Sequence, residues 1–516
     1  MDLNFPGKPL KNQQIFGGEE IISEAQDRIS KLPDSILLHI LSLLPTKLAA
    51  QTGILSKRWK DLWVSVSSLD FEMHLRANYT GDVNAFGSFT KPKIERLANF
   101  LNRLFAIRGN SRIKKFRLAC DRLEFDSRCV STWLSAACNI EELDLEIWEI
   151  REFPWSDFVG NSLVTLKLSV DVLLDIPSTV SFPSLKILHL HSVTYVNDAS
   201  IEKFLSCCPV LEDLQISRTD WDNIQNFVIA VPSLKRLNLE FNIHEMYLYD
   251  TDDPEDIYDC KLFVDAPNLE YLSLLDYMSY SIQVNHMDYV TKSYLSVNKI
   301  LEMDHWTDEQ ISNYGSNVCG IFRSIHNVKC LTIGDFTMES LAEALDRRLP
   351  TFHNLVHLEI ILDGVNGAML LPNLLKISPK LKSLILPQGI TRPGLQGFNP
   401  EENQTISYRW KPPENVLECL LLSLKNVEIR RISGKVEEEL KLVKYLLENA
   451  MVLEKMTICY EKWLVSGGPM DNTSDPTARL LDDPFAFRDK LMNWIRGSPA
   501  CQLDIQIPES TTLNLK

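Results

Sequence analysis

The chain has 516 residues, 45% of them hydrophobic, so it can bury a large core and divide into two to four domains. Lys and Arg total 53 against 69 Asp and Glu, and the net charge of −16 has the wrong sign for a phosphate backbone, which argues against nucleic acid as a partner. We find neither a signal-peptide core nor a run of about 18 apolar residues, so we expect a soluble protein with no membrane partner.

The 11 cysteines are odd in number, scattered, and form no C-x-x-C pair, which indicates reduced thiols and a location in the cytoplasm, the nucleus or both. The adjacent pair Cys207 and Cys208 has two interpretations, a redox-active pair or packing residues before Pro209 in a repeat. We favour packing because the pair precedes a repeated apolar pattern.

Residues 1–24 begin with the polar stretch MDLNFPGKPLKNQQ, and we expect them to be disordered. The segment Asp27–Trp63 then predicts three short helices. Leu32-Pro33 opens the first, Thr46 can cap the second and Ser56 the third. Three helices in so few residues cannot enclose a self-sufficient core, so the rest of the chain or another protein must cover part of their apolar surface.

The residue order in this segment, L-P-D-x-I-L-x-x-I-L-S-x-L-P-T-K followed by L-S-K-R-W-x-x-L-W, resembles the F-box of plant F-box proteins. The resemblance implies an F-box at residues 25–72 that binds the Skp-type adaptor of cullin-RING ubiquitin ligases. The adaptor-binding residues it implies are Leu32, Pro33, Ile36, Leu37, Ile40, Leu41, Leu44, Pro45, Leu55, Ser56, Lys57, Arg58, Trp59 and Trp63.

Two positions depart from the F-box pattern. Leu48 stands where the family usually has Asp, and Gly53 stands where Ser is commoner. We expect Gly53 inside a helix, where it weakens the helix by about 1 kcal/mol relative to Ala. The adaptor affinity is expected to fall accordingly.

After the F-box the chain repeats the unit Pro/Asn-x-Leu-x-x-Leu-x-Leu, and five successive units are 23, 22, 26 and 23 residues apart, the spacing of leucine-rich repeats. We assign residues 112–400 to these repeats. Within each L-x-L the two Leu side chains share one side of a short strand and are buried, and stacked units form a parallel sheet on the concave side of a solenoid. The segment Ala199–Cys208 predicts a helical return.

The middle residue of each L-x-L points to the other side of the sheet, where a protein substrate can bind. These substrate-binding candidates are Asp144, Lys167, His189, Gln215, Asn238, Ser273, Thr332, Glu359 and Ile385.

Two inserts interrupt the repeats. The first contains the acidic run Tyr249–Asp259, which predicts a solvated loop or, alternatively, a loop that contacts substrate. The second, residues 279–304, alternates apolar and polar residues and predicts extra strands.

Residues 408–462 predict a strand (Leu424–Ile429), a break at Gly434, a helix with an apolar stripe and a second strand (Leu453–Ile458). Trp410, Pro413, Val416 and Cys419 resemble the opening motif of the plant FBD domain, with Leu417 in place of the family's Pro. The segment can cap the solenoid or bind a ligand, and we expect residues 463–516 to complete the cap.

No residues predict a catalytic, metal or cofactor site. His353 and His357 have the spacing of a zinc motif without its Glu and lie in an expected repeat strand, while His189 and His191 alternate outward from Leu188 and Leu190. The sequence has no phosphate-binding loop, nucleophile elbow or dinucleotide motif. We expect a protein that is not an enzyme and has no cofactor.

The predicted fold is therefore α/β, with a three-helix F-box, a leucine-rich-repeat solenoid and a small α+β FBD cap. The resemblance implies a substrate-recognition subunit of a Skp-cullin-F-box ubiquitin ligase, joined through the adaptor to cullin and RING subunits. Two alternatives stay open. One is a protein that binds the adaptor without a ligase role, and the other is a co-receptor that binds a small-molecule hormone on the repeats.

Overall fold

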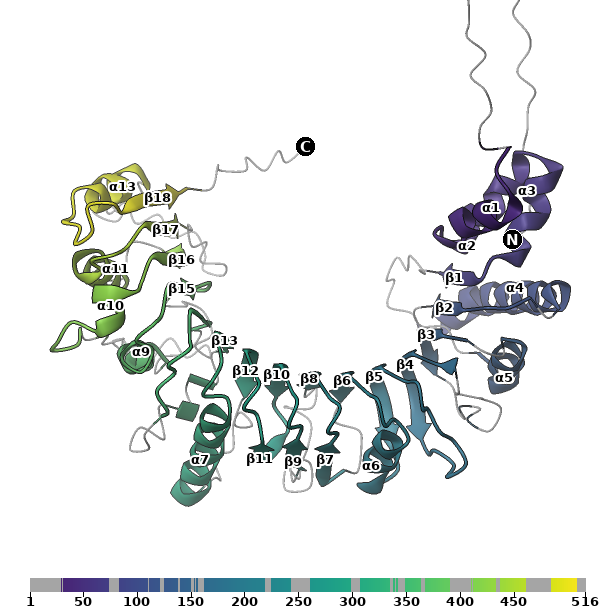
Figure 1. Ribbon diagram of the computed structural model, residues 1–516, viewed down its shortest axis with the longest axis horizontal. Helices are drawn as coiled ribbons and strands as arrows, with labels where there is room; N and C mark the ends of the chain where they lie inside the picture. The colour runs from purple at the N-terminus through teal and green to yellow at the C-terminus, as the bar shows by residue number, and fades with distance from the viewer. Residues whose placement is uncertain are drawn as a thin grey trace, which may run out of the picture. The chain divides into compact units, whose positions relative to one another are not determined.

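Figure 1 shows a computed structural model, which describes most of the chain. The chain divides into two compact units that we treat separately. Unit 1 comprises residues 1–196 and 206–211, and unit 2 comprises residues 197–205 and 212–516. The expected N-terminal segment 1–24 and the acidic run Tyr249–Asp259 lie outside the described residues. Those residues are 29, 31–73, 83–109, 111–120, 125–137, 140–149, 153, 155, 162–218, 224–242, 260–297, 307–334, 337–338, 340–341, 349–362, 367–389, 410, 412–432, 437–460 and 484–507.

Unit 1 begins with the three predicted helices, α1 (Asp34–Ser42), α2 (Thr46–Gln51) and α3 (Lys57–Leu62). The prediction for Ser56 is confirmed, because its Oγ accepts a hydrogen bond from the Trp59 backbone N–H at 3.4 Å and caps α3. The prediction that Thr46 caps α2 is wrong. Pro45 occupies the cap position, and Thr46 is the first helical residue with a buried side chain.

Gly53 does not lie inside an α-helix as predicted. It lies in the 3-10 turn η1 (Thr52–Ile54) between α2 and α3. A Cβ atom at this position would stand 3.3 Å from the Cα of Lys60, so the glycine allows η1 and α3 to approach each other closely. The cost expected for a glycine in a helix interior therefore does not apply here.

The helices lead directly into a parallel sheet. In unit 1 its strands pair in chain order as β1 (Ser68–Glu72), β2 (Lys115–Cys120), β3 (Glu142–Glu149), β4 (Thr165–Leu174) and β5 (Ile187–Tyr195). Alternate residues of β2, such as Phe116 and Leu118, are fully buried, and the Phe116 ring meets the Phe105 ring edge-on at 5.7 Å. Phe105 belongs to α4 (Val83–Arg108), and α5 (Ser127–Ala136) packs beside that helix. The sheet thus buries the helix-facing side of each L-x-L, as period two requires.

Unit 2 continues the pattern with strands that pair in parallel. Their order is β6 (Asp213–Arg218), β8 (Arg236–Phe241), β10 (Tyr271–Asp276), β12 (Lys292–Val297), β13 (Cys330–Ile333), β14 (His357–Ile360), β15 (Ser383–Leu386), β16 (Asn426–Ile432), β17 (Lys455–Tyr460) and β18 (Gln502–Gln506). The predicted return helix is α6 (Ala199–Ser206), and later connections contain α7 (Asp308–Ser324) and α9 (Gly367–Lys376).

The extra strands predicted in residues 279–304 are confirmed, but they belong to two sheets. β12 is a further repeat strand of the main sheet, whereas β11 (Ser279–Asn285) joins β9 (Cys260–Asp265) and β7 (Asn226–Ala230) in a separate parallel sheet. Short strands therefore take the place of return helices between β6 and β12. Their alternating pattern could not distinguish the two sheets.

The two strands predicted between residues 408 and 462 correspond to β16 and β17, shifted by about two residues, and the predicted helix is α11 (Glu437–Asn449). α10 (Glu418–Leu422) precedes β16, and α13 (Pro484–Met492) precedes β18. All three strands extend the parallel sheet that begins in the repeats. The FBD segment is therefore built as further turns of the same sheet. Among the described helices, none has the length and apolarity to cross a membrane.

Candidate functional site

The three-helix module exposes a set of large apolar side chains. Ile36 and Ile40 lie one turn apart in α1, and Leu43 follows at its C-terminal cap. Leu48, Ile54 and Leu55 follow in α2 and the turn before α3. Their exposed fractions run from 39% to 79%. We call these six residues the helical patch. Single exposed apolar residues are ordinary, but six within 20 residues of one small module indicate a protein-binding surface.

The predicted adaptor-binding residues divide by burial. Leu37, Leu41 and Trp59 are at most 7% exposed and pack inside the module, so they support the surface from within and cannot themselves touch a partner. The sequence missed Leu43 and Ile54, although Leu43 continues the stripe of Ile36 and Ile40. The residues that are exposed or half-buried are Leu32, Pro33, Ile36, Ile40, Leu44, Pro45, Leu55, Ser56, Lys57, Arg58 and Trp63.

Arg58 is engaged within the module. Its Nε donates to Asp34 Oδ1 at 2.8 Å, and its Nη2 donates to the Leu32 carbonyl oxygen at 2.6 Å. The guanidinium of α3 therefore holds the start of α1, where the helix dipole also favours the Asp34 carboxylate. This contact fixes the Leu32-Pro33 segment beside α3.

Polar contacts join the module to α4 and to β1. Arg108, at the end of α4, donates through Nη2 to the Val66 carbonyl at 2.7 Å and through Nη1 to that of Val64. Burial lowers the pKa of Arg108 to about 10, which leaves it charged at neutral pH. The Thr46 hydroxyl accepts a hydrogen bond from the Asp70 N–H of β1 at 2.7 Å.

The substrate-binding candidates of unit 1 occupy one row on the side of the sheet opposite the buried leucines. Strand register places Asp144 beside Lys167 and Lys167 beside His189. The same row begins with Asp70 and Arg117. Neither residue was predicted, because the first Leu-x-Leu repeat in the sequence is that of β3, although Phe116-Arg117-Leu118 has the same alternation.

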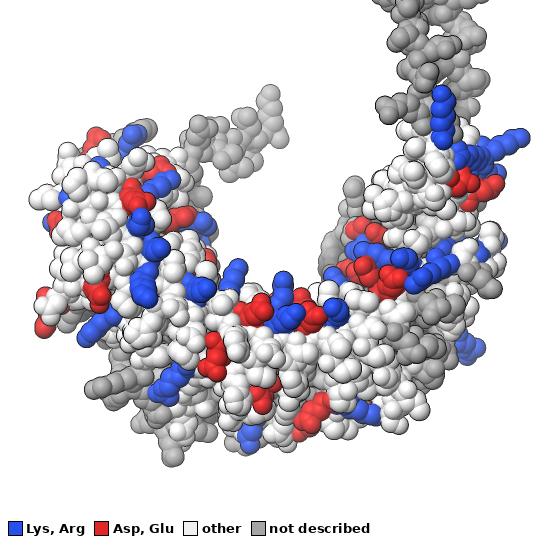
Figure 2. Space-filling view, viewed as in Figure 1, with Lys and Arg blue, Asp and Glu red and all other residues white. Residues whose placement is uncertain are grey.

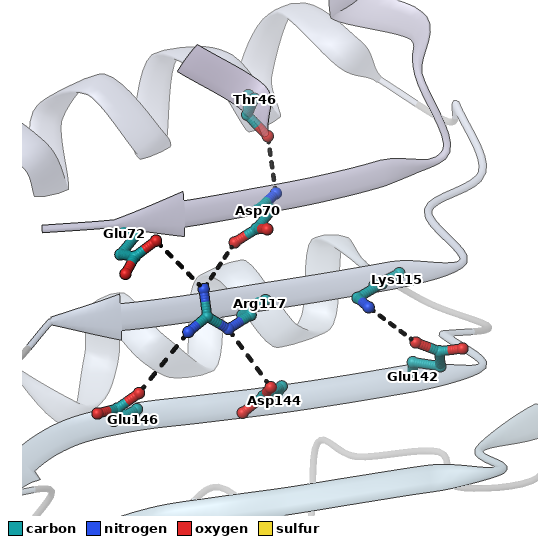
Figure 3. Close-up of polar contacts among 8 residues, drawn as sticks. All are labelled: Thr46, Asp70, Glu72, Lys115, Arg117, Glu142, Asp144 and Glu146. Atoms are coloured by element: carbon teal, nitrogen blue, oxygen red, sulfur yellow. Dashed lines mark hydrogen bonds and ion pairs between the residues drawn. The ribbon is translucent and has the colours of Figure 1, made fainter. Parts of the chain in front are cut away.

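Arg117 lies among four carboxylates from the neighbouring strands (Figure 3). Its guanidinium nitrogens lie 3.1 Å from Asp70, 3.8 Å from Glu72, 3.5 Å from Asp144 and 3.8 Å from Glu146. Partial burial lowers the pKa of Arg117, but the hydrogen bond to Asp70 and the negative charges around it outweigh this, and the pKa is raised above its ordinary value. One cation thus links β1, β2 and β3 across their open face.

In unit 2 the candidates again form one row, in the order Gln215, Asn238, Ser273, Thr332, Glu359 and Ile385. Tyr294 of β12 lies between Ser273 and Thr332 and was missed, because β12 does not keep the Leu-x-Leu pair. Ser273 is only 8% exposed, whereas the others are half-buried. Their alignment is a property of the fold, and substrate binding by them stays a prediction.

Trp410, Pro413 and Cys419 of the FBD opening motif pack against other parts of the chain, whereas Val416 is exposed. The Trp410 ring contacts the Tyr445 ring of α11 with centroids 5.3 Å apart, and both border a small gap lined by Leu371 and Leu375 of α9. Cys419 Sγ donates to the Leu375 carbonyl at 3.4 Å. Burial raises the pKa of the Cys419 thiol to about 11. These contacts attach the FBD segment to the preceding repeat and favour the capping alternative.

The remaining motifs show no chemistry beyond packing. His357 is the first residue of β14, but His353 lies in the turn before it, so the prediction that both lie in one strand is wrong. His189 and His191 lie in β5 and are half-buried. Cys207 and Cys208 form no disulfide, and burial raises the pKa of Cys208 to about 12. Within the described ranges, no three His, Cys, Asp or Glu residues gather where they could hold a metal ion.

Three known families match parts of the chain in order. The F-box domain matches residues 29–71, the Leucine Rich Repeat residues 184–209, and FBD residues 411–458. An F-box/FBD/LRR-repeat protein of Arabidopsis thaliana is 34% identical over 93% of this chain and 96% of its own length. An F-box/LRR-repeat protein of that plant is 30% identical over 85% of this chain and 89% of its own. With these three matches and a relative of nearly the same extent, the chain belongs to the plant family of F-box/FBD/LRR-repeat proteins.

Proposed function

We propose that the chain is the substrate-recognition subunit of a Skp-cullin-F-box ubiquitin ligase. The observation that carries the proposal is the helical patch, which leaves six large apolar side chains exposed on the module that matches the F-box domain. Burying a side chain of this size contributes roughly 1.5 to 3 kcal/mol, so an apolar partner surface gains affinity from each of them. The proposed partner is the Skp-type adaptor, and through it cullin and RING subunits.

The open face of the repeat strands is the proposed site for a protein substrate. Its rows mix acidic, basic, amide and hydroxyl side chains, a composition suited to protein recognition. Ubiquitin transfer then follows from proximity, because the chain holds the substrate near the charged conjugating enzyme and supplies no catalytic group. We place the protein in the cytoplasm or nucleus, where its thiols stay reduced.

Reconstitution with purified adaptor tests the first step. Ile40→Asp with Leu43→Asp puts charge into the helical patch, and we expect adaptor binding by calorimetry to fall by about a hundredfold. Ile107→Asp with Met369→Asp is the matched control, since both positions are exposed outside the F-box, at 72% and 56%. Full-strength binding by the patch variant would contradict the proposal.

Two further outcomes separate the alternatives. A chain that binds adaptor but fails to bring cullin into the complex supports an adaptor-binding protein without a ligase role. A chain whose substrate binding requires an added plant hormone supports a small-molecule co-receptor. Ubiquitination of a bound protein in the reconstituted complex, without added ligand, supports the proposal as stated.

A further inference from the structure

A ladder of ion pairs runs along the strand starts of unit 2 at both flanks. On one flank Lys235 Nζ lies 2.9 Å from Glu212 Oε2, and Arg236 Nε lies 3.3 Å from Asp213 Oδ2. On the other flank Lys425 Nζ lies 2.6 Å from Glu454 Oε1, and Lys455 Nζ lies 3.4 Å from Asp504 Oδ2. In each of these pairs the carboxylate comes from the neighbouring strand. The positive charges on the two flanks are therefore neutralised within the chain.

The ladder is interrupted between β12 and β15. Lys292, Lys329 and Lys382 are exposed there, and no carboxylate of the described residues lies within ion-pair distance of any of them. We call these three residues the lysine rim. Thr291, Val356 and Cys330, which pair with these strand starts, carry no charge, and the Glu270 carboxylate on the preceding strand acts on Lys235.

Backbone hydrogen bonds fix the rim in place. The Lys329 N–H donates to the Thr291 carbonyl at 2.8 Å, the Val356 N–H to the Lys329 carbonyl at 2.9 Å, and the Lys382 N–H to the Val356 carbonyl at 2.9 Å. Since neighbouring strands lie about 4.8 Å apart, the backbones of Lys329 and Lys382 are about 10 Å apart. Lys292 begins β12, paired with Cys330, and its ammonium lies 5.9 Å from the centre of the Tyr271 ring.

A protein of net charge −16 that leaves three neighbouring lysines uncompensated has a local field opposite to its overall field. Figure 2 shows Lys and Arg side chains gathered over the later strands of unit 2. We infer that the lysine rim docks an acidic, Asp- and Glu-rich segment of the substrate protein. This inference rests on the proposed function and adds to it the chemical class of the substrate.

The spacing favours carboxylates over a phosphate group. A phosphate site concentrates donors on one ion, through a guanidinium fork or consecutive backbone N–H groups. The rim instead places single ammonium groups on separate strands. Separate single negative charges along an extended segment can meet these groups one by one, because three residues of extended chain span about 10 Å.

Fluorescence anisotropy with defined peptides tests the inference on the full-length protein. The probe is a fluorescein-labelled peptide of alternating Glu and Ser, compared with a peptide that has Gln for Glu, and with one that has Gln for Glu and phosphoserine for Ser. We expect the Glu peptide to bind most tightly, and we expect its affinity to fall as salt is added. Equal binding of the Glu and Gln peptides would overturn the inference, and tighter binding of the phosphoserine peptide would assign the rim to phosphate instead.

Charge reversal locates the binding. The test variant reverses the charge of all three rim residues, Lys292→Glu, Lys329→Glu and Lys382→Glu. We expect its affinity for the Glu peptide to fall by about tenfold or more. The matched control makes the same change of net charge at three exposed helix positions, Lys376→Glu, Lys444→Glu and Lys490→Glu. Its affinity for the Glu peptide should stay within about twofold of wild type. Equal loss in both triple variants would mean a nonspecific field, against the inference.

A neutral variant and a parallel adaptor-binding measurement complete the experiment. If the reversed triple lowers the melting temperature, the neutral triple Lys292→Gln, Lys329→Gln, Lys382→Gln replaces it, with an expected loss of about threefold. Adaptor binding is measured on the same samples. Loss of peptide binding with adaptor binding intact isolates the rim, whereas a wild-type chain that binds peptide but no adaptor refutes the proposed function and leaves the rim standing.

Discussion

The hydroxyl of Thr46 accepts a hydrogen bond from the backbone N–H of Asp70 at 2.7 Å. Thr46 opens α2 and Asp70 lies in the middle of β1, the first strand of the sheet. β1 has a paired strand on only one side among the described residues, so its other edge needs partners for its backbone N–H groups. The F-box therefore covers the edge of the first strand of the sheet.

Thr46→Val removes this contact while keeping the side-chain shape. It leaves the Asp70 N–H without a partner, and we expect the free energy of unfolding to fall by about 1 to 3 kcal/mol in urea denaturation. Thr52→Val is the control, because Thr52 Oγ1 only donates to the Ala49 carbonyl within its own helical segment. A similar cost for both variants would contradict the edge-covering role of Thr46.

Arg58→Lys tests whether the contact with Leu32 and Asp34 positions the helical patch. Lysine keeps the charge but cannot make two directed hydrogen bonds at once, so we expect adaptor binding to weaken by roughly 1 kcal/mol. Lys60→Gln changes an exposed position of the same helix outside the predicted adaptor-binding residues, and should have little effect on adaptor binding. Unchanged affinity in the Arg58 variant would remove the positioning role.

Arg117→Gln leaves Asp70, Glu72, Asp144 and Glu146 facing one another without a cation. While these carboxylates are charged, their mutual repulsion destabilises the folded variant. Acid that protonates them relieves the repulsion, so the stability lost at neutral pH recovers as the pH falls. In the wild type the raised pKa of Arg117 keeps it protonated across the whole range.

The measurement for this variant is the melting temperature between about pH 4 and pH 8. The deficit of Arg117→Gln relative to wild type should be largest at neutral pH and shrink toward the acidic end. Arg236→Gln, which has one carboxylate partner, should show a smaller deficit. A deficit of constant size would mean that Arg117 acts through packing alone.

Trp410→Ala tests whether the FBD segment is a cap that depends on the repeats. The indole is 5% exposed, and its loss should cost about 3 to 5 kcal/mol by leaving a cavity against Tyr445 and α9. Hydrogen exchange should show loss of protection that spreads from α11 into β16 and α9 together. Exposure confined to residues after 410 would favour an independent domain.

Alkylation distinguishes the vicinal thiols. Burial raises the pKa of Cys208 to about 12, so its reactive thiolate is scarce near neutral pH, and Cys207 is less buried. At about pH 8 we expect iodoacetamide to modify Cys207 at least tenfold faster, as read by mass spectrometry of the shared peptide. Equal rates would revive the redox-pair interpretation.

Much of the architecture could be read from residue order. The Leu-x-Leu pairs located most repeat strands, and the stacked register places their middle residues in one row within each unit. The pattern failed at β1 and β2, at β12, and at the separate sheet of β7, β9 and β11. In β2 Phe116 replaces the first Leu of the pair, and in β12 Ser293 does, and a short alternating run does not say which neighbour it will pair with.

The sequence by itself determined the family, the three-helix start and the stacking of repeats, because these follow from residue identity and local period. Only the tertiary structure decided that Leu37, Leu41 and Trp59 are core while Ile40 and Leu43 are exposed, since a helical stripe reveals one apolar face and not what covers it. It also decided which charges meet across strands. Arg117 has four carboxylates around it, and the lysine rim has no carboxylate within ion-pair distance among the described residues. The strand register decides this, because it places residues side by side that lie far apart along the chain.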